Sequence, residues 1–557
     1  TIRGEAGWHA AAQADFAAMV RAVDDQRTRG YSSNDYWAGE YFERSGDLSR
    51  ALEYYRTSAR YIPGDPRSLS GLTRVFEALG QDDSAELAAA AHDSVLARWT
   101  PLEHPLLPEF LARHGRTAEA IALARRWAAR QTSTGNVQGA VLATLQVGAL
   151  ELAAKYADNA LTAAMLADRL AAGLHLITER VQASQLAGKA LIALGRREEG
   201  LATLQRLAAL TAAHPTTSNI FTSQLALGDA LAATGHAAEA LQAYDRSARI
   251  VDVVTTRLIE DLDRAGYRGR HLDPFDGALA VLLARPASPG RTEAVVRWSQ
   301  RRKAAALALA TAGAENGSRY QRSLRQLQRA LGPEDALLDY LVLPVSVAVV
   351  VITHRTARVI PLPVEPDSLR IWAGRLRQPL QAVYAGNVDL ARAPFDLAIA
   401  HRLYESLLRP LESVLVGCNR LAIVPDGALQ LIPFAALVSQ MPPEGHSYAD
   451  ARYPIDTAEV RYLPSSQFLD AAGGGPAAPL RMLAVLETAP GAEREVALLR
   501  AALGPGHVDV IAGAEATRSR VLSAGAHYPV LHFAVHAVAD GRDPLASHLR
   551  LAPDSTS

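Results

Sequence analysis

The pattern of hydrophobic positions changes at Asp335 and predicts two kinds of structure. Before this residue, small and apolar residues recur with helical spacing, which predicts a long series of helices. After it, short β-branched and apolar runs alternate with helical segments. The first runs, residues 336–354 and 356–364, predict a strand pair or hairpin. Apolar strands that alternate with helices are typical of a mainly parallel sheet covered by helices on both faces.

The rest of the second half continues this α/β pattern. Further strands are expected within residues 420–437, 460–466, 482–488, 508–513 and 530–537. Helices are expected at residues 368–385, 394–415, 492–504 and 517–525. In such a sheet, functional residues are expected just past the carboxyl ends of the strands.

A glycine recurs along the helical half, followed each time by a small residue five positions later. A glycine that ends one helix in a left-handed cap, and a small residue where two helices cross, allow helical pairs to stack. Aromatic residues such as Tyr55 and Tyr244 then fill the gap to the next pair. The glycines, spaced by 34, 35, 33, 47 and 40 residues, are Gly46, Gly80, Gly115, Gly148, Gly195 and Gly235.

This pattern resembles the tetratricopeptide (TPR) repeat over roughly residues 30–250. The resemblance implies a superhelix whose concave groove holds a peptide or a protein. The alternative is a plain α-helical bundle. The charged cluster of Arg125, Arg126 and Arg130 is interpreted as solvated surface.

Residues 251–330 keep a helical pattern but break the rhythm of the repeat, so we interpret them as a connector. Within it, Arg297, Arg301, Arg302 and Lys303 precede an apolar run. A basic amphipathic segment can contact nucleic acid or a membrane, but a solvated face that leads into a packed helix is the preferred interpretation. Direct binding of nucleic acid is therefore not expected. The predicted organisation is a helical repeat at 1–250, a connector at 251–330 and an α/β domain at 331–557.

The composition of the chain excludes several classes of function. The 557 residues carry 57 basic and 58 acidic side chains, so no overall basic field marks a nucleic-acid or membrane-surface binder. With one cysteine, Cys418, an intramolecular disulfide or a cysteine-based metal cluster is excluded. No apolar run is long enough to span a bilayer and no signal peptide is visible, so a cytoplasmic location is expected. The chain begins at Thr1, which suggests a trimmed methionine or a start inside a longer chain.

The strongest candidate for chemistry is His536, at the predicted end of a largely apolar strand. A histidine placed there can project into a cleft with few rotamers, as a general base requires. A hydrogen-bonded structural histidine is the alternative. Short motifs on both sides of His536 in the sequence form a specific combination with it. They are Val424, Pro425, Asp426, Gly427, Leu429, Pro433, Phe434 and Leu437; Tyr462, Pro464 and Ser465; Glu493, Glu495 and Val496; Ala516 and Thr517; His532, Phe533 and Ala534; and Pro544, Ser547, Leu549 and Leu551.

The combination resembles the CHAT family of caspase-like cysteine proteases, often found fused to TPR arrays, and covers roughly residues 295–557. The family implies a His–Cys dyad in which His536 assists a cysteine thiolate. It also implies that the backbone N–H after the histidine helps to stabilise the oxyanion, and this position, usually glycine, is Ala537 here.

The family's nucleophilic cysteine lies on the next strand, and this chain stops at Ser557 before reaching it. Cys418 lies far upstream of His536 and is interpreted as a small buried hydrophobe, with a stand-in nucleophile as the alternative. We expect a truncated or partly ordered chain, with a natural pseudoenzyme as the second possibility.

The resemblance implies an endopeptidase that cleaves a protein substrate after a protein or ribonucleoprotein partner binds the TPR groove. Such proteins often act in prokaryotic defence or cell death, with RNA-guided effectors and gasdermin-like substrates among the partners. The alternative is a scaffold with an inactive caspase-like domain. No cofactor, membrane contact or particular oligomeric state is predicted.

Two other groups of residues near His536 are alternatives for chemistry. His527, His532 and His548 lie close in sequence, but His532 and His536 would be about 13 Å apart along a strand, too far to share a metal ion. For His532 we expect hydrogen bonds within the sheet. Asp540 and Asp543 are interpreted as loop residues, with a contact to a basic substrate side chain as the alternative. The glycines at 473–475 lack the rest of a phosphate-binding loop and predict a linker.

Overall fold

A computed structural model describes residues 35–44, 48–62, 64–79, 81–96, 105–213, 215–257, 267–303, 321–384, 394–443, 448–469, 481–486, 492–535, 537–538 and 548–552. Two compact units divide the chain, Thr1–Leu469 and Asp470–Ser557. In the described residues, no helix is both long and apolar enough to cross a membrane.

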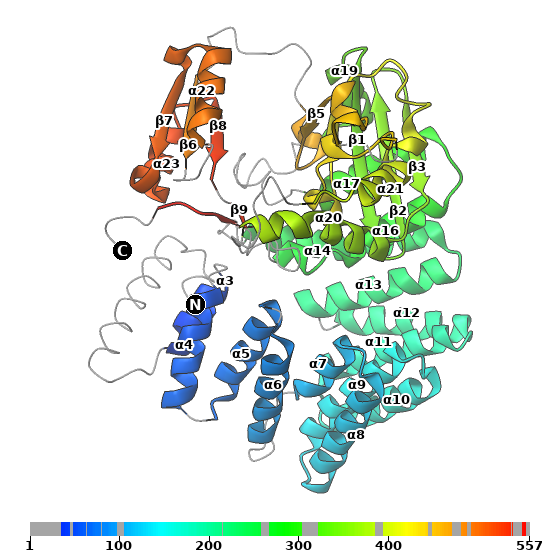
Figure 1. The fold of residues 1–557 in the computed structure, drawn as a ribbon. Coiled ribbons are helices and arrows are strands. Elements are labelled where there is room, and N and C mark those ends of the chain that lie inside the picture. Colours follow the sequence, from blue (N-terminus) through cyan, green and yellow to red (C-terminus); the bar gives the residue numbers. More distant parts are fainter. Residues whose placement is uncertain are drawn as a thin grey trace. The chain divides into compact units, whose positions relative to one another are not determined.

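The first unit begins with a solenoid in which each helix packs against the next in sequence (Figure 1). This confirms the expected helical repeat. The helices are α3 (Asp35–Arg44), α4 (Leu48–Tyr61), α5 (Pro66–Ala78), α6 (Asp82–Leu96), α7 (Leu107–Arg113), α8 (Thr117–Ser133), α9 (Val137–Ala153), α10 (Ala157–Gly173), α11 (Ile177–Ala193), α12 (Arg197–Ala213), α13 (Thr217–Ala233) and α14 (Ala237–Arg257).

From α8 to α14 the solenoid is more regular than the glycine spacing predicted. Each helix from α8 to α13 has 17 residues, and successive helices begin 20 residues apart. The left-handed turn positions follow the same interval from Gly115 through Gly135, Lys155 and His175 to Gly195, and Gly235 lies two such intervals further on.

The left-handed cap is therefore confirmed at Gly115, Gly195 and Gly235, whereas the prediction for Gly148 is wrong. Gly148 lies inside α9, where an added Cβ would come within 2.6 Å of Leu186 Cδ2. The turn that it was expected to make is made by Lys155. A glycine that allows a close helix crossing and a glycine that ends a helix look alike in sequence. Gly46 and Gly80 lie outside the described residues.

The aromatic residues fill the gaps between helices as expected. Tyr55 is fully buried between Gly39 and Gly71, and Tyr244 takes the same place between Gly228 and Gly277. Both phenol groups donate to a carboxylate, Tyr55 to Glu43 at 2.6 Å and Tyr244 to Asp229 at 2.9 Å.

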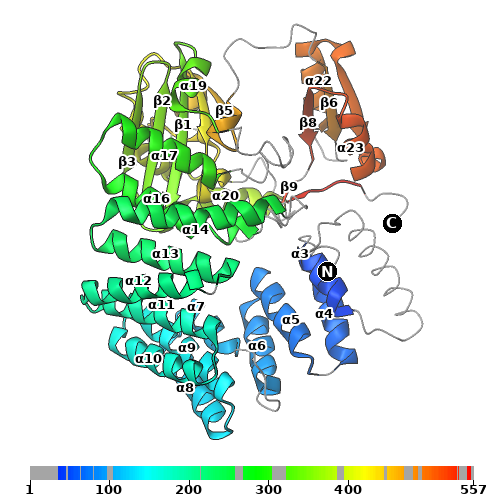
Figure 2. The ribbon, with the colours of Figure 1, turned by 180° about the vertical axis from the view of Figure 1, so that it is seen from behind.

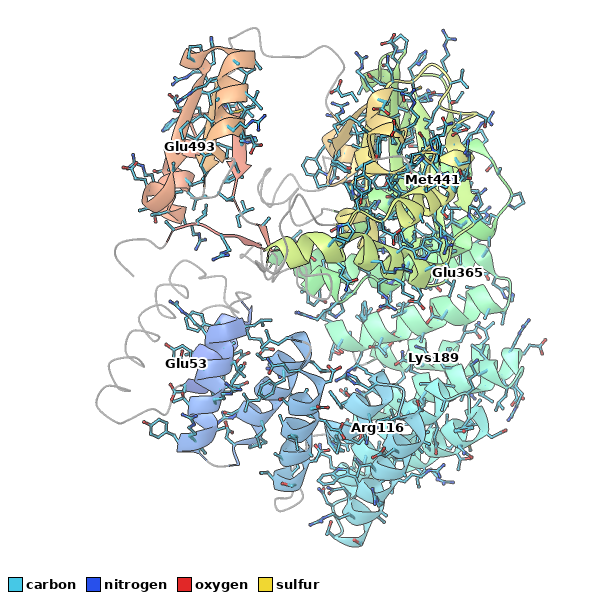
Figure 3. All side chains as sticks on the ribbon, in the orientation of Figure 1. Glu53, Arg116, Lys189, Glu365, Met441 and Glu493 are labelled. Carbon is cyan, nitrogen blue, oxygen red and sulfur yellow. The ribbon has the colours of Figure 1, made fainter. Side chains whose placement is uncertain are left out.

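Ion pairs also join neighbouring helices on the solenoid surface. Arg116, labelled in Figure 3, contacts Glu86 at 2.7 Å and Glu119 at 2.9 Å.

We predict that Gly228→Ala destabilises the solenoid by about 1–3 kcal/mol, because the core there is already filled. The new Cβ would lie 2.7 Å from Tyr244 Cδ1. Gly173→Ala is the matched control: this helical glycine has nothing within 4 Å of the added Cβ, so the substitution should be neutral or stabilising. Chemical denaturation of the three proteins measures both effects, and equal stability of the two variants would contradict the packing argument.

A five-stranded sheet follows in the same unit, in the order β3-β2-β1-β4-β5. The strands are β1 (Asp335–Leu343), β2 (Ser346–Thr353), β3 (Ala357–Leu362), β4 (Arg420–Val424) and β5 (Glu459–Tyr462). β1, β2 and β3 pair antiparallel, whereas β4 is parallel to both β1 and β5. The predicted strand pair at 336–364 is therefore three strands. Pro344, which has no N–H for the ladder, starts a two-residue turn that splits the first run in two.

Helices cover both faces of this sheet. On one face lie α16 (Asp273–Ala284), α17 (Pro289–Arg302) and α19 (Leu324–Ala330), packed in one core with α13 and α14 (Figure 2). On the other lie α20 (Pro366–Tyr384) and α21 (Leu397–Leu407). Alternate residues of β1 enter each core, Leu337 and Leu341 the first and Leu338 and Tyr340 the second. The end of the solenoid and the sheet thus share one continuous core.

The second unit is a smaller parallel sheet in the order β7-β6-β8. Its elements are β6 (Met482–Leu486), α22 (Ala492–Leu503), β7 (Val508–Ala512), α23 (Arg518–Gly525), β8 (Val530–Ala534), β9 (Ala537–Val538) and β10 (His548–Leu549). The two helices pack on opposite faces, since α22 shares a core with Ala484 and Leu486 and α23 shares one with Leu483 and Val485. The expected fold class, a helical solenoid followed by sheets with mostly parallel strands, is confirmed.

Single 3-10 turns complete the described structure. They are η3 (Arg409–Leu411), η4 (Gly427–Leu431), η5 (Phe434–Ala436), η6 (Tyr448–Asp450), η7 (Pro454–Asp456), η8 (Ser466–Phe468), η9 (Pro505–His507) and η10 (Gly513–Glu515).

Candidate functional site

The order of strands in the second unit marks one place for a site. After the central strand β6 the chain passes through α22 to β7 on one side, and then through α23 to β8 on the other. The strand order therefore reverses between β6 and β8, whose last residues, Leu486 and Ala534, are partners in the ladder. In open α/β sheets, ligands bind outside the carboxyl ends of the strands at such a switch point.

Position 536 comes two residues after the end of β8 in the sequence. β8 ends at Ala534, two residues earlier than the predicted strand end. His536 itself lies outside the described residues. Ala537, the predicted oxyanion donor, is the first residue of β9, is exposed, and pairs with Leu549 of β10.

The alanine at position 537 is not under left-handed strain. Among the described residues, a positive φ outside glycine occurs only at Lys155 and His175. The backbone at Ala537 therefore keeps an ordinary φ with a Cβ in place, and its N–H is preserved as a possible donor.

His532, one of the rival residues, faces α22. Its Nε2 lies 3.1 Å from Glu495 Oε1, and its side chain is 26% exposed. The prediction of a partner within the sheet is therefore wrong, because His532 and Ala534 lie on the α22 side of β8 and meet the carboxylate there. His532 is therefore part of the packing between α22 and β8.

The described residues bring together no group of three or more His, Cys, Asp or Glu side chains placed to hold a metal ion. Of the clustered histidines, the structure describes the side chains of His527 and His532 only. Asp540, Asp543 and the glycines at 473–475 also lie outside the described residues.

The lone cysteine lies in the first unit, at the amino end of β4. Cys418 is half-buried, and its Sγ lies 3.8 Å from the carbonyl oxygen of Asp335. Burial, and then the negative charge of Asp335, raises the pKa of the Cys418 thiol above its usual value. Because the thiolate is the nucleophilic form, this environment disfavours Cys418 as a nucleophile and fits a small packed side chain.

The basic residues at the end of α17 do not form a solvated face, so that prediction is wrong for three of the four. Arg301 pairs with Asp245 and Asp252 of α14, both at 2.8 Å, and its side chain is 12% exposed. Lys303 contacts Asp339 of β1 at 2.6 Å and is almost fully buried. The last turn of α17 is packed between α14, α16 and the sheet, where carboxylates meet it from several elements. Only Arg297 is exposed.

Arg302 is the centre of this buried network. Its guanidinium contacts Asp276 of α16 at 2.5 Å and Asp426, which follows β4, at 2.7 Å. Asp426 also accepts the N–H of Val342 at 2.7 Å. Burial alone would raise the pKa of Asp426, but Arg302 and Lys303 together with this N–H hold it below its usual value. Asp426 therefore fixes the carboxyl end of β4 to β1 and α17.

The sequence carries a signal for this network. Three consecutive basic residues end a helix that has apolar residues on its other side, and an acidic residue directly follows an apolar strand. Opposite charges placed at the ends of neighbouring buried elements pair, because a buried charge without a partner is costly.

Comparison with known protein families identifies one part of the chain. The CHAT domain family matches residues 397–557, a range that includes β4, β5 and the whole second unit. The chain carries a CHAT domain. The CHAT domain follows a helical repeat of the TPR kind, so the chain has a TPR–CHAT architecture, and the CHAT family comprises caspase-like peptidases.

Solved structures add distant likenesses to parts of this architecture. A Rap protein complexed with competence and sporulation factor is 13% identical, with a TM-score of 0.28, and the match covers 51% of this chain and 74% of that one. A tetratricopeptide repeat protein from Parabacteroides merdae is 16% identical, with a TM-score of 0.27, over 47% of this chain and 98% of that one. The Saccharomyces cerevisiae separase–securin complex is 8% identical, with a TM-score of 0.25, over 92% of this chain and 55% of that one. No curated protein matches the chain.

Proposed function

We propose that the protein is a TPR-regulated, caspase-like cysteine endopeptidase that cleaves a protein substrate in the cytoplasm. The observation that carries the proposal is the CHAT match together with the strand order of the second unit. The residue that the family resemblance assigns as the base, His536, follows the carboxyl end of β8 by two positions, next to the switch point between β6 and β8.

In the proposed reaction, His536 takes the proton of a cysteine thiol, and the thiolate attacks the scissile carbonyl. The N–H of Ala537 stabilises the resulting oxyanion. The leaving amine takes the proton from the imidazolium, and water then hydrolyses the acyl-enzyme.

The nucleophile in this proposal is a cysteine that follows His536 in the natural chain. In the described residues β8 pairs with β6 alone, so its other edge is open to a further parallel strand. A strand added there would bring its carboxyl end beside that of β8. Cys418 is not proposed for this role, since its pKa is raised and it lies at the amino end of β4.

The solenoid groove is proposed to bind the activating protein or ribonucleoprotein partner, and the setting to be prokaryotic defence or cell-death signalling. Support for regulation comes from the shared core of the first unit, which joins α13 and α14 to the sheet without a break. The second candidate function is a scaffold whose CHAT domain is inactive.

The proposal predicts that Cys418→Ser leaves proteolysis unchanged. The natural full-length protein and the variant are expressed in cells of the source organism under conditions that activate it, and new protein N-termini are measured by mass spectrometry. Both proteins should generate the same set of N-termini, because the Cys418 side chain only packs against its neighbours. Loss of these N-termini in the variant would make Cys418 the nucleophile, and their absence from both would favour the scaffold.

A further inference from the structure

The first unit has a surface groove beside β5 that the proposed peptidase chemistry does not use. Three adjoining hollows form it, and we call them together the edge groove. The first, of 540 Å³, is lined by Glu334, Arg420, Ile455 and Glu459 among others. The second, of 410 Å³, shares Ile455 with the first. The third, of 370 Å³, shares Phe395 with the second and ends at Arg377 and Tyr462.

The middle hollow has apolar walls. Its lining consists of Phe395, Ala435, Ala436, Tyr448, Tyr453 and Ile455. Ile455 is 64% exposed and Tyr448 is 49% exposed, although both are large apolar side chains. Side chains of this kind on the wall of a hollow are typical of a surface that a partner covers.

The two ends of the edge groove carry opposite charge. Glu334 and Glu459 are exposed in the first hollow, and in the part of the chain that the structure describes neither forms an ion pair. Arg420, in the same hollow, pairs with Asp335 at 2.5 Å, and the charges of Glu334 and Glu459 also act on it, so three carboxylates surround one guanidinium. Arg377 in the third hollow likewise forms no ion pair with another described residue. The groove is therefore acidic at one end and basic at the other.

An open strand edge runs between the two ends. Glu459 and Tyr462, the first and last residues of β5, line the first and third hollows. The Glu459 N–H donates to the carbonyl oxygen of Asn419, just before β4, at 2.7 Å, and the Leu463 N–H donates to that of Ile423 in β4, at 2.8 Å. The backbone groups of Val460 and Tyr462 therefore point away from β4, and among the described residues no strand pairs with them. An extended peptide can add to such an edge by main-chain hydrogen bonds.

We propose that the edge groove binds an extended peptide segment of a partner protein. The segment pairs with the open edge of β5 and places an apolar side chain in the middle hollow. Basic side chains lie over Glu334 and Glu459, and an acidic side chain lies beside Arg377. The residues that line the edge groove all belong to the first unit and do not include His536, so the proposal does not depend on whether the protein is a peptidase.

The test measures fluorescence anisotropy of labelled peptides with the full chain. The probes carry Lys-Arg at one end, Leu at the centre and Asp-Glu at the other end, in both orders along the peptide. At least one order should bind with a micromolar Kd, and replacing the central Leu by Ser should weaken binding at least tenfold. Saturable binding of neither order would overturn the proposal, whether the groove is empty or filled by a segment of the chain itself.

Variants distinguish peptide binding in the edge groove from nonspecific hydrophobic binding. Ile455→Asp should weaken binding at least tenfold, whereas Val416→Asp, which changes an apolar side chain 82% exposed outside the groove, should leave the Kd unchanged. Glu459→Lys should weaken binding of the basic end. Equal loss in Ile455→Asp and Val416→Asp would overturn the proposal. The protein could also form a dimer that Ile455→Asp abolishes and that the peptides do not dissociate. This result would assign the edge groove to a second copy of the chain and would also overturn the proposal.

Discussion

Arg302→Met is expected to lower the free energy of unfolding by about 3–5 kcal/mol, because removing one partner of a buried ion pair leaves the other charge without compensation. The Arg302 and Asp426 side chains are each only 8% exposed, and Arg302 also pairs with Asp276. The substitution therefore leaves one buried carboxylate, Asp426, and one partly buried carboxylate, Asp276, without their guanidinium. Denaturant unfolding at pH 7 measures the loss.

Two further variants test whether the loss of stability comes from the buried charge. Arg302→Met combined with Asp426→Asn removes the buried charge, and should recover part of the lost stability. Arg409→Met is the matched control, since Arg409 pairs with Glu405 at 2.7 Å on the surface and should contribute less than about 1 kcal/mol. A loss no larger for Arg302→Met than for Arg409→Met would show that the buried network does not hold the unit together.

The same pair predicts a pH dependence. The pKa of Asp426 is lower in the folded protein than in the unfolded chain, where it is about 3.9. The stability that this lowering contributes is therefore complete above about pH 4, and is lost as the pH falls through the folded pKa. In Arg302→Met that contribution is absent, so the difference in stability between wild type and variant should be largest near neutral pH and shrink below pH 4.

His536→Ala is expected to reduce kcat/KM for the protein substrate by roughly a thousandfold, since it removes the proposed general base. The effect should fall on kcat, because the imidazole assists proton transfer and does not hold the substrate. His532→Ala is the matched control, because His532 lies in β8, four positions before His536 in the sequence, and contacts Glu495 of α22. It should keep kcat/KM within about tenfold of wild type, with a modest loss of stability. Equal losses in both variants would contradict the separate roles of the two histidines.

The sequence predicted the helices and most strands well, because each depends on a local pattern. The β-branched runs gave β2, β6 and β7, and the recurring small residues gave the solenoid. The positions of the turns between the solenoid helices could not be predicted in the same way. Lys155 and His175 adopt the left-handed turn without being glycine, whereas Gly148 serves a helix crossing. Tertiary packing, and not residue type, decides between these two uses of a small residue.

The buried network shows a second limit of sequence patterns. Arg302 is 124 residues from Asp426, and Arg301 is 56 residues from Asp245, so no local window contains both partners. Read locally, the basic run predicts a solvated face. For the candidate site the pattern of an apolar strand followed by His536 located the carboxyl end of β8 to within two residues. The position of the switch point required the strand order, which the sequence does not contain.

The proposed His–Cys dyad is tested by mapping the cysteine that reacts with iodoacetamide in the active full-length protein. We expect rapid alkylation, with loss of proteolysis, at a cysteine that follows His536 in the natural chain. Alkylation at that cysteine should slow in His536→Ala, because the thiolate is no longer favoured. Inactivation through Cys418, or a rate unchanged by His536→Ala, would contradict the proposed His–Cys dyad.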